Sequence, residues 1–394
     1  MSASPESGAA VVDLDLAGRA TIDERARARV IVRFRHRVLG TLNLPGRDPR
    51  PVRERAVRQS VRRLLAELVL PEVPDPETWP PVTIVVCTRS RAEGLGECLA
   101  SLAALDYPDF EVVVVDNAPD DDSTKRVTDE HGVRYVLEPK PGLDWARNTG
   151  FVAARTELVA YTDDDARPEP GWLRGLARAF ESPAVAAAAG LVIPGELETD
   201  AQRLFENVYR GMGKGYDFRM LGGHNRQHAL RPELVGTGCN MAFRRATLEA
   251  LGGFDPALDV GTATRGGGDL DAFVRVMERG EVIAYRPDAV VRHFHRRTMP
   301  ELRQQLRDNG SGYVAMLLAA FGRAQGRDRA RIVRRYCAWM IQWQLMRVVR
   351  RVVRRERLPM RLILAEVHGA LRGVWAYRRA RRAAARLATG GRGT

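Results

Sequence analysis

The 394-residue sequence contains no apolar run long enough to cross a membrane. Its longest candidates, Val185–Ile193 and Val314–Phe321, fall well short of the roughly 18–20 residues that a spanning helix needs. Residues 1–10 lack a basic stretch followed by an apolar core, so we expect no signal peptide. With 45% hydrophobic and 28% charged residues, the composition predicts a globular cytoplasmic protein with a substantial core.

Cysteine is scarce, and its spacing excludes two common uses. The four residues form no CxxC pair and no metal-ligand pattern, which argues against a disulfide framework and a cysteine zinc site. We therefore expect all four to be reduced, buried thiols: Cys87, Cys98, Cys239 and Cys337.

Lysine is nearly absent, and the positive charge is unevenly placed. The formal net charge of +13 at first suits a nucleic-acid binder. However, residues 323–394 hold twenty arginines and three acids, a net of +17, which leaves −4 for the rest of the chain. The central region is therefore not basic, and nucleic acid is not an expected partner. The arginine bias itself suggests a GC-rich genome.

Residues 1–78 are expected to form a small N-terminal α+β unit. Alternating apolar and polar residues in 27–44 predict strands, with Leu39-Gly40 as the turn between them. Helical spacing follows in 53–68. Five prolines in 71–81 predict a linker that is neither helix nor central strand.

From Val82 the pattern changes to alternating strands and helices. Continuous β-branched runs such as 82–88 are typical of parallel strands buried on both faces. The alternation predicts an α/β fold, an open sheet with helices on its faces. The expected strands are 82–88, 110–116, 133–137 and 158–162, and the expected helices are 93–105, 124–130 and 144–154.

Polar residues follow three of these strands at their carboxyl ends, where open α/β sheets bind ligands. They are Thr88-Arg89, Asp116-Asn117 and Asp163–Asp165. The acid triplet lies in YTDDDARPEPGWL and closes an apolar strand. Mg²⁺ and Mn²⁺ prefer carboxylate and phosphate oxygens, so Asp163 and Asp165 can supply half of a metal site. The alternative is a solvated acidic turn, a conformation that Asp favours by itself.

Six segments, in order, resemble the family-2 glycosyltransferases over roughly Pro80–Arg297. They are VTIVVCTRSRAEGLGECLASL, FEVVVVDNAPDDDS, GLDWARNTG, YTDDDARPEPGWL, GTGCNMAFRRATLEALGGFD with the following GGGDLDAFVRV, and VVRHFHR. The resemblance, to a member of actinobacterial appearance, implies a GT-A fold with an open mixed sheet. It also implies an inverting glycosyltransferase that uses a nucleotide diphosphate sugar, with a UDP or dTDP donor expected.

The resemblance also implies roles for individual residues. Asp116 would accept a hydrogen bond from the base, Thr88 and Arg89 would line the base pocket, and Arg147 would reach the base or the diphosphate. Asp163 and Asp164 would contact the donor, while Asp165, Asp163 and His293 would hold Mn²⁺ or Mg²⁺. His293 and His295 alternate on an expected strand and so should share a face. Structural or surface roles are the alternatives for Asp116, Arg147 and each histidine, and Trp172 and Phe254 are expected in the core.

Inversion needs a base that takes the proton of the attacking hydroxyl. The resemblance points to Asp269, which follows a glycine run and opens an expected helix, 270–278. Many family members carry Glu-Asp here, whereas this chain has Gly268-Asp269, so the first acid is absent. Asp271 is a competing candidate, and a helix-capping Asp269 is another interpretation.

The basic tail completes a three-part division into residues 1–78, a catalytic domain at 79–300 and a helical extension at 301–394. Two helices are expected, 331–357 and 361–387. They form either a hairpin packed on the catalytic unit or a segment on anionic lipid at the inner face of the membrane.

Two other functions are weighed against a glycosyltransferase. One is a sugar nucleotidyltransferase, although CTRSRAEGLG has only scattered glycines where that enzyme needs a phosphate-cradling loop. The other is a non-catalytic nucleic-acid binder acting through the tail, which leaves the acid triplet unexplained. The acceptor stays open: a glycan, a lipid-linked sugar or a small natural product.

Overall fold

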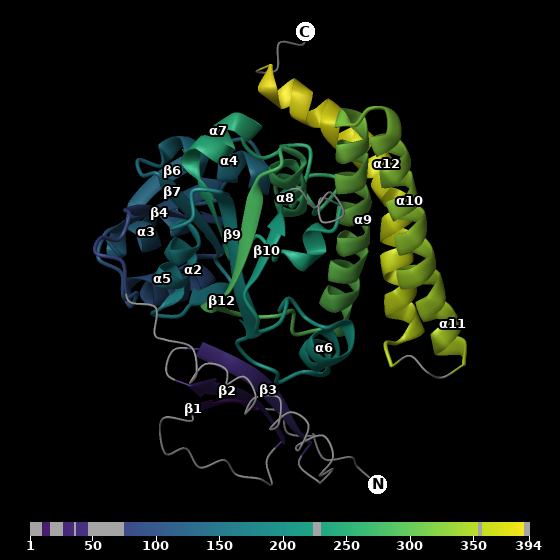
Figure 1. Cartoon of the computed structure of the whole chain (residues 1–394), viewed down its shortest axis with the longest axis horizontal. Coiled ribbons are helices and arrows are strands. Elements are labelled where there is room, and N and C mark those ends of the chain that lie inside the picture. Colours follow the sequence, from purple (N-terminus) through teal and green to yellow (C-terminus); the bar gives the residue numbers. More distant parts are fainter. Residues whose placement is uncertain are drawn as a thin grey trace.

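The computed structural model describes residues 10–15, 27–34, 37–45, 75–223, 230–353 and 357–389. It contains a small sheet, a large sheet flanked by helices, and a layer of long C-terminal helices (Figure 1). In this described part of the chain no helix is both long enough and apolar enough to cross a membrane.

The large sheet has nine strands and is mixed. Its order is β10-β12-β9-β11-β7-β4-β5-β6, with β8 paired to β12. Strands β4 to β7 are mutually parallel, as predicted, whereas β11 runs antiparallel between β7 and β9. The bounds are β4 (Val82–Thr88), β5 (Phe110–Asn117), β6 (Arg134–Glu138), β7 (Leu158–Asp163), β8 (Ala166–Pro168), β9 (Val185–Pro194), β10 (Arg219–Gly222), β11 (Met241–Arg244) and β12 (Val282–His293).

Helices cover both faces of this sheet, and each predicted helix of the α/β region is present. They are α2 (Ala92–Ala103), α3 (Ser123–Glu130), α4 (Leu143–Ala153), α5 (Trp172–Ala179), α6 (Asp200–Leu204), η1 (Phe205–Tyr209), η2 (Pro232–Leu234), α7 (Arg245–Leu251) and α8 (Gly268–Glu278). Neighbouring strand residues face opposite sides, so Ile84 joins one core cluster and Val85 the other. Trp172 and Phe254 are buried in these clusters, which confirms their core placement.

The N-terminal sheet is formed by β1 (Ala10–Asp15), β2 (Arg27–Phe34) and β3 (Arg37–Pro45). The predicted turn at Leu39-Gly40 is wrong, because both residues lie inside β3. Val32 pairs with Gly40 but Arg33 pairs with Val38, so Leu39 is the extra residue of a bulge beside Gly40, and glycine is common at such bulges. The helix expected at 53–68 lies outside the described residues.

This small sheet packs on the large sheet at β9 and β12. Ile31 and Val38 share an apolar cluster with Leu191 and Val290. At the edge of the same contact the Arg33 guanidinium binds both carboxylate oxygens of Glu169, at 2.7 and 2.5 Å. The N-terminal unit is thereby attached to the two strands that lead toward the acidic end of the sheet.

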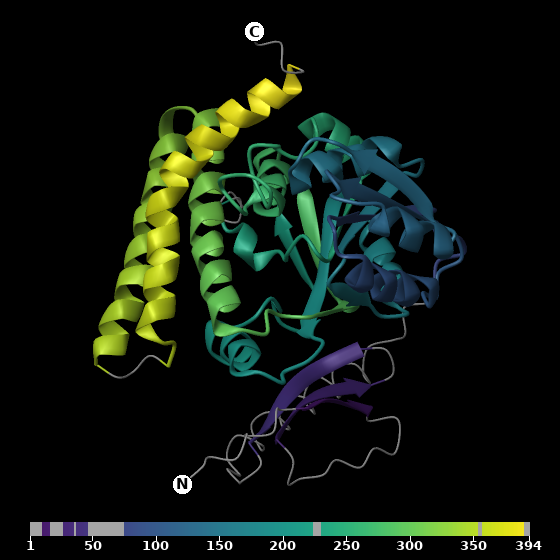
Figure 2. The ribbon, with the colours of Figure 1, turned by 180° about the vertical axis from the view of Figure 1, so that it is seen from behind.

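The C-terminal helices lie on the side of α8 (Figures 1 and 2). They are α9 (Met299–Arg323), α10 (Gly326–Trp339), η3 (Met340–Leu345), α11 (Met346–Val352) and α12 (Met360–Ala388). Of these, α9 lies nearest to the large sheet, with α10 and α12 further out. Both predicted tail helices are present, although the first ends at Val352 rather than at residue 357. A side chain at Gly369 of α12 would overlap the carbonyl of Arg307, so the backbones of α9 and α12 cross in contact.

The tail helices are held to one another by buried polar contacts. The Arg347 guanidinium of α11 donates to Glu366 of α12 at 2.8 Å, and both side chains are almost fully buried.

The prediction that all four cysteines are buried is wrong for Cys337, which lies on the exposed face of α10. Cys87, Cys98 and Cys239 are buried and free.

Candidate active site

Parallel pairing of β4 with β7 brings Thr88 and the acid triplet together at their carboxyl ends. The Thr88 hydroxyl donates to Asp164 Oδ2 at 2.7 Å, and Arg91 Nη1 donates to Asp164 Oδ1 at 2.6 Å. Both carboxylate oxygens of Asp164 are therefore engaged, and its side chain is buried. Asp164 therefore links the segment after β7 to Thr88 at the end of β4, and it remains a candidate contact of the sugar-nucleotide donor.

The other two acids of the triplet face His293 at the end of β12. His293 Nε2 lies 3.2 Å from Asp165 Oδ1, and Arg91 donates to Asp165 Oδ2 at 3.2 Å. Ligand atoms of Asp163, His293 and Cys239 lie within 4.8 Å of one another. Among the described residues, the Asp163 carboxylate makes no hydrogen bond or ion pair. The Asp163 carboxylate and the His293 imidazole belong to this group, and Asp165 contacts the same imidazole, so oxygen and nitrogen donors suited to Mn²⁺ or Mg²⁺ lie around His293.

Asp163 and Asp165 differ in the direction in which their pKa values are shifted. Burial, followed by the negative charge of Asp165, raises the pKa of Asp163 to about 7. Burial also opposes ionisation of Asp165, but His293 and Arg91 outweigh it and lower the pKa of that carboxyl. Burial raises the pKa of the Cys239 thiol well above its usual value. A neutral thiol is a poor ligand for a hard cation, so Asp163, Asp165 and His293 are the better set.

Behind His293 a chain of polar contacts reaches the N-terminal sheet. His293 Nδ1 lies 3.2 Å from His295 Nδ1, which confirms that the two histidines share a face although His295 lies beyond β12. His295 Nε2 lies 3.2 Å from Glu206 Oε2, and Glu206 Oε1 lies 2.9 Å from Arg29. The sequence patterns gave no signal for Glu206 or Arg29, because they come from segments far apart in the chain.

Asp116 ends β5 and is fully buried. Its Oδ2 accepts a hydrogen bond from the Tyr135 hydroxyl at 3.0 Å, whereas its Oδ1 makes no hydrogen bond in the described structure, although the Thr124 hydroxyl lies close to this carboxylate. Burial raises the pKa of the Asp116 carboxyl. A buried acceptor without a donor costs free energy until a donor arrives. Arg89 lies further out, half-exposed and 3.6 Å from Asp120.

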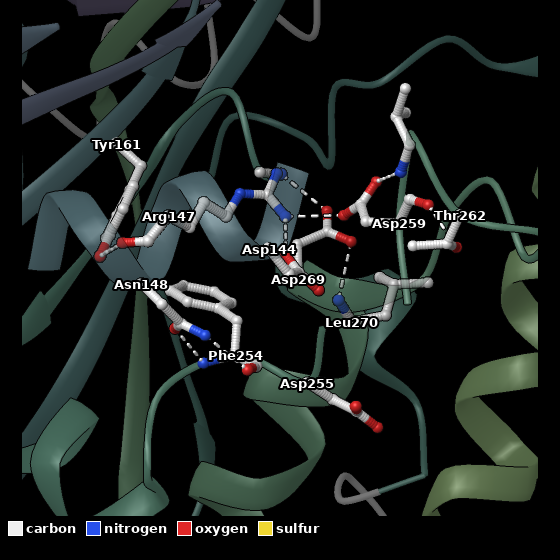
Figure 3. Close-up of polar contacts among 12 residues, drawn as sticks. Asp144, Arg147, Asn148, Tyr161, Phe254, Asp255, Asp259, Thr262, Asp269 and Leu270 are labelled. Carbon is white, nitrogen blue, oxygen red and sulfur yellow. Dashed lines mark hydrogen bonds and ion pairs between the residues drawn. The ribbon is translucent and has the colours of Figure 1, made fainter. Parts of the chain in front are cut away.

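Arg147 lies in the centre of a buried acid cluster (Figure 3). Its guanidinium donates to Asp144 at 2.8 Å and to Asp259 at 2.6 Å. A side chain at Gly238 would overlap this guanidinium, so glycine is required there. The structure thus places Arg147 in ion pairs within the protein, with Gly238 of the GTGCN loop beside it.

Asp269 lies next to this cluster and accepts two backbone hydrogen bonds. Gly238 N donates to its Oδ2 at 2.7 Å, and Leu270 N donates to its Oδ1 at 2.8 Å. The N-cap of α8 is Gly267, and no side chain caps this helix. Burial and the charge of Asp259 raise the pKa of the Asp269 carboxyl.

Asp271 and Gly268 occupy different surroundings. Asp271 is fully buried and pairs with Arg275 and Arg323, each at 2.8 Å, so both of its oxygens already face cations. A side chain at Gly268 would overlap the Asp144 carboxylate. The acid that the sequence lacks at position 268 therefore has no room in this structure, and a carboxylate from α4 fills its place.

Lys214 is a further charged residue near Asp269 that the sequence patterns did not single out. Burial lowers the pKa of its ammonium group, while the charges of Glu233 and Asp269 act in the opposite direction.

A mixed sheet of this order, with acids at the ends of its parallel strands, defines an α/β enzyme of the GT-A class. The profile described as Glycosyl transferase family 2 matches residues 83–252. The glucosyl-dolichyl phosphate glucuronosyltransferase of Haloferax volcanii is 30% identical over 227 residues, covering 54% of this chain and 68% of that protein. The chain belongs to glycosyltransferase family 2.

Two further similarities are weaker in coverage or shape. The pre-mycofactocin glycosyltransferase of Mycobacterium tuberculosis is 27% identical over 254 residues, covering 61% of this chain. The chain spans about half the length of that relative, 49%. The mannosyltransferase PcManGT of Pyrobaculum calidifontis, solved with GDP-Man and Mn²⁺, is 24% identical. It covers 84% of this chain, and 82% of its own length is covered, with a TM-score of 0.48.

Proposed function

We propose that the protein transfers a sugar from a nucleotide diphosphate sugar, of UDP or dTDP type, to an acceptor hydroxyl with inversion. The observation that carries this proposal is the placement of Asp163 beside His293 at the ends of β7 and β12, with Asp165 in contact with the same histidine and Asp116 at the carboxyl end of β5. The proposed nucleotide and metal sites therefore lie at the same end of the sheet, where these strands have their carboxyl ends.

The donor is held by groups of two kinds. Asp116 Oδ1 accepts the imino N–H of uracil or thymine, because this buried oxygen lacks a donor. Thr88 and Arg89 border that pocket, while the Arg147 guanidinium is already paired with Asp144 and Asp259. Asp163, Asp165 and His293 hold Mn²⁺ or Mg²⁺, which offsets the charge that develops on the departing nucleoside diphosphate.

Asp269 acts as the general base for the acceptor hydroxyl. Its backbone hydrogen bonds to Gly238 and Leu270 fix the carboxylate while leaving lone pairs for the incoming proton. A raised pKa brings a carboxyl nearer to the working pH, which strengthens it as a base. Asp271 is a weaker candidate because two arginines already neutralise it.

Two features bear on the acceptor. One relative is named for glucosyl-dolichyl phosphate and another for pre-mycofactocin, so a lipid-linked sugar and a small natural product are both acceptor classes to test. The tail also carries an exposed apolar stripe beside its arginines, comprising Ile341, Leu345, Val349 and Val352. Such a face suits peripheral contact with an anionic membrane.

Two tryptophans of the tail do not belong to this stripe. Trp339 packs against Tyr313 with ring centroids 4.7 Å apart, and Trp343 Nε1 donates to Glu366 at 3.3 Å. The two packed tryptophans and the exposed apolar stripe therefore lie on different faces of the consecutive helical elements α10, η3 and α11.

A nucleotide-release assay tests the proposed function. The full chain is incubated with UDP-, dTDP- and GDP-sugars, with Mn²⁺ or with excess chelator, and each candidate acceptor class is added in turn. We expect metal-dependent release from a uracil or thymine donor that an acceptor accelerates. Transfer of a nucleotidyl group with release of diphosphate would instead establish a nucleotidyltransferase.

A further inference from the structure

A cavity of about 740 Å³ lies between the catalytic domain and the C-terminal helices. One wall comes from the loops that precede α4 and α8, and the other from α9 and α12, which run side by side (Figure 2). Its size is that of a pocket for a small organic ligand. None of the donor or metal residues described above lines it.

Four arginines surround this cavity: Arg265, Arg307, Arg372 and Arg379. Within the described ranges no guanidinium of this set lies within 4.0 Å of a carboxylate. Asp308 is the one acid in the lining, and its Oδ1 accepts a hydrogen bond from the Gln304 amide at 2.7 Å. Burial raises the pKa of the Asp308 carboxyl, whereas the charges of Arg265, Arg307 and Arg372 act in the opposite direction, so an ionised Asp308 offsets part of the positive charge. Four arginines and one acid still leave an excess of positive charge around the space, which an anion between them would offset. Guanidinium groups match the oxygens of phosphate in particular.

The remaining wall is largely apolar. Trp145 contributes one side, and Ala380, Ala384 and Leu387 contribute a face of α12. A small inorganic ion would leave these surfaces in contact with water. An amphiphile would cover them while its charged group met the arginines.

The cavity adjoins the loop that carries the proposed base. Arg265 immediately precedes the glycine run that leads to Asp269, and Trp145 directly follows Asp144. Glycine is required in that run because a side chain at Gly267 would overlap the carbonyl of Gly312 in α9. The C-terminal helices thus touch the backbone that sets the position of Asp269.

We propose that this cavity binds the phosphate group and the adjoining apolar part of an amphiphilic acceptor. The assignment of this ligand as the acceptor rests on the proposed function, whereas binding itself does not. Residues 301–394 then have a role beyond packing: α9 and α12 supply three of the four arginines that recognise the acceptor.

Binding of octyl phosphate, below its micelle concentration, tests the pocket directly. Isothermal titration of the full chain is carried out in chelator, which prevents a divalent ion from holding phosphate at the aspartates. Octanol and inorganic phosphate supply the apolar part and the anion separately. We expect octyl phosphate to bind about tenfold more tightly than either, because it uses both surfaces.

A pair of double variants on α12 separates the pocket from general positive charge. Arg372→Gln with Arg379→Gln removes two pocket cations, and Arg378→Gln with Arg382→Gln removes two exposed arginines of the same helix outside the lining. The first should weaken octyl phosphate binding about tenfold, and the control should not. The pocket is tested by octyl phosphate binding in chelator and the proposed function by metal-dependent nucleotide release from the unmodified protein, so a failure of one differs from a failure of the other.

Four results would overturn the proposal. Inorganic phosphate that binds as tightly as octyl phosphate would exclude the amphiphile. If both double variants lose octyl phosphate binding equally, the binding is due to the general positive charge of α12 and not to the cavity. If the protein binds phosphatidylglycerol vesicles but not monomeric octyl phosphate, the arginines form a diffuse membrane-binding surface. Absence of binding by the unmodified protein would exclude the site.

Discussion

Arg29 of the N-terminal sheet and Glu206 of the catalytic domain form an ion pair of 2.9 Å. Glu206 in turn contacts His295, and His295 contacts His293, at 3.2 Å in each case. Partners behind a metal ligand fix its orientation and tune its affinity. The N-terminal unit is therefore connected to the proposed metal site through three side chains rather than attached as an independent accessory.

We expect Glu206→Gln to weaken Mn²⁺ binding about tenfold, the lower end of the effect of losing a residue behind a metal ligand. The amide cannot hold His295 and Arg29 by charge. Calorimetric titration of Mn²⁺ into the protein with UDP measures this without reference to activity. Glu198→Gln is the matched control, since Glu198 is exposed and pairs with Arg297. Equal Mn²⁺ affinities in all three proteins would show that the chain of contacts is only structural.

Asp165→Asn should abolish turnover and weaken UDP binding in Mn²⁺, because it removes a proposed ligand and the charge facing His293. The measurements are sugar transfer and UDP affinity, each with Mn²⁺ and with chelator. Full activity of Asp165→Asn, or of the unmodified protein in excess chelator, contradicts the metal role.

The metal-free protein should lose stability as pH rises from about 4 to about 7. The pKa of Asp163 is raised from 3.8 to about 7, mainly by burial and then by Asp165. A carboxyl with a raised folded pKa contributes stability that is present below its unfolded pKa and is lost as pH rises through the folded one. Melting temperatures across this range, in chelator, should fall more steeply for the unmodified protein than for Asp163→Asn. If the melting temperatures of the two proteins fall equally with pH, the raised pKa of Asp163 does not cause the loss of stability.

Asp269→Asn should reduce transfer by roughly 10²–10⁴-fold while donor binding survives, as expected for loss of a general base. Single-turnover transfer and UDP titration are the two measurements. Asp271→Asn is the informative comparison, because it breaks the pairs with Arg275 and Arg323 and should lower the melting temperature. Near-normal transfer by Asp269→Asn, together with a folded but inactive Asp271→Asn, would move the base to Asp271.

Asp116→Asn should weaken UDP binding by about ten- to a hundredfold, the worth of a hydrogen bond to a charged group. It should also narrow the preference for UDP over CDP, because an amide offers both a donor and an acceptor to the base. Asp120→Asn on the following loop is the control, since that carboxylate is exposed. If Asp116→Asn binds both nucleotides as the unmodified protein does, Asp116 serves only to end β5.

The sequence by itself determined the parallel strands, their flanking helices and the identity of the acids at the strand ends. Period-two and helical patterns are local, so β4, β5 and β7 were predictable within a residue or two. The turn at Leu39-Gly40 was mispredicted because a glycine in a bulge and a glycine in a turn produce the same local signal.

Only the tertiary structure decided which of these residues meet. The contacts between Arg29 and Glu206, between Asp144 and the space beside Gly268, and around the arginine-lined cavity join segments more than a hundred residues apart. Such contacts depend on how whole helices and sheets pack, and no local spacing encodes them. The sequence identified the candidate acids, whereas packing determined the pKa values of their carboxyl groups. Burial and neighbouring charges shift those pKa values by amounts that composition cannot predict.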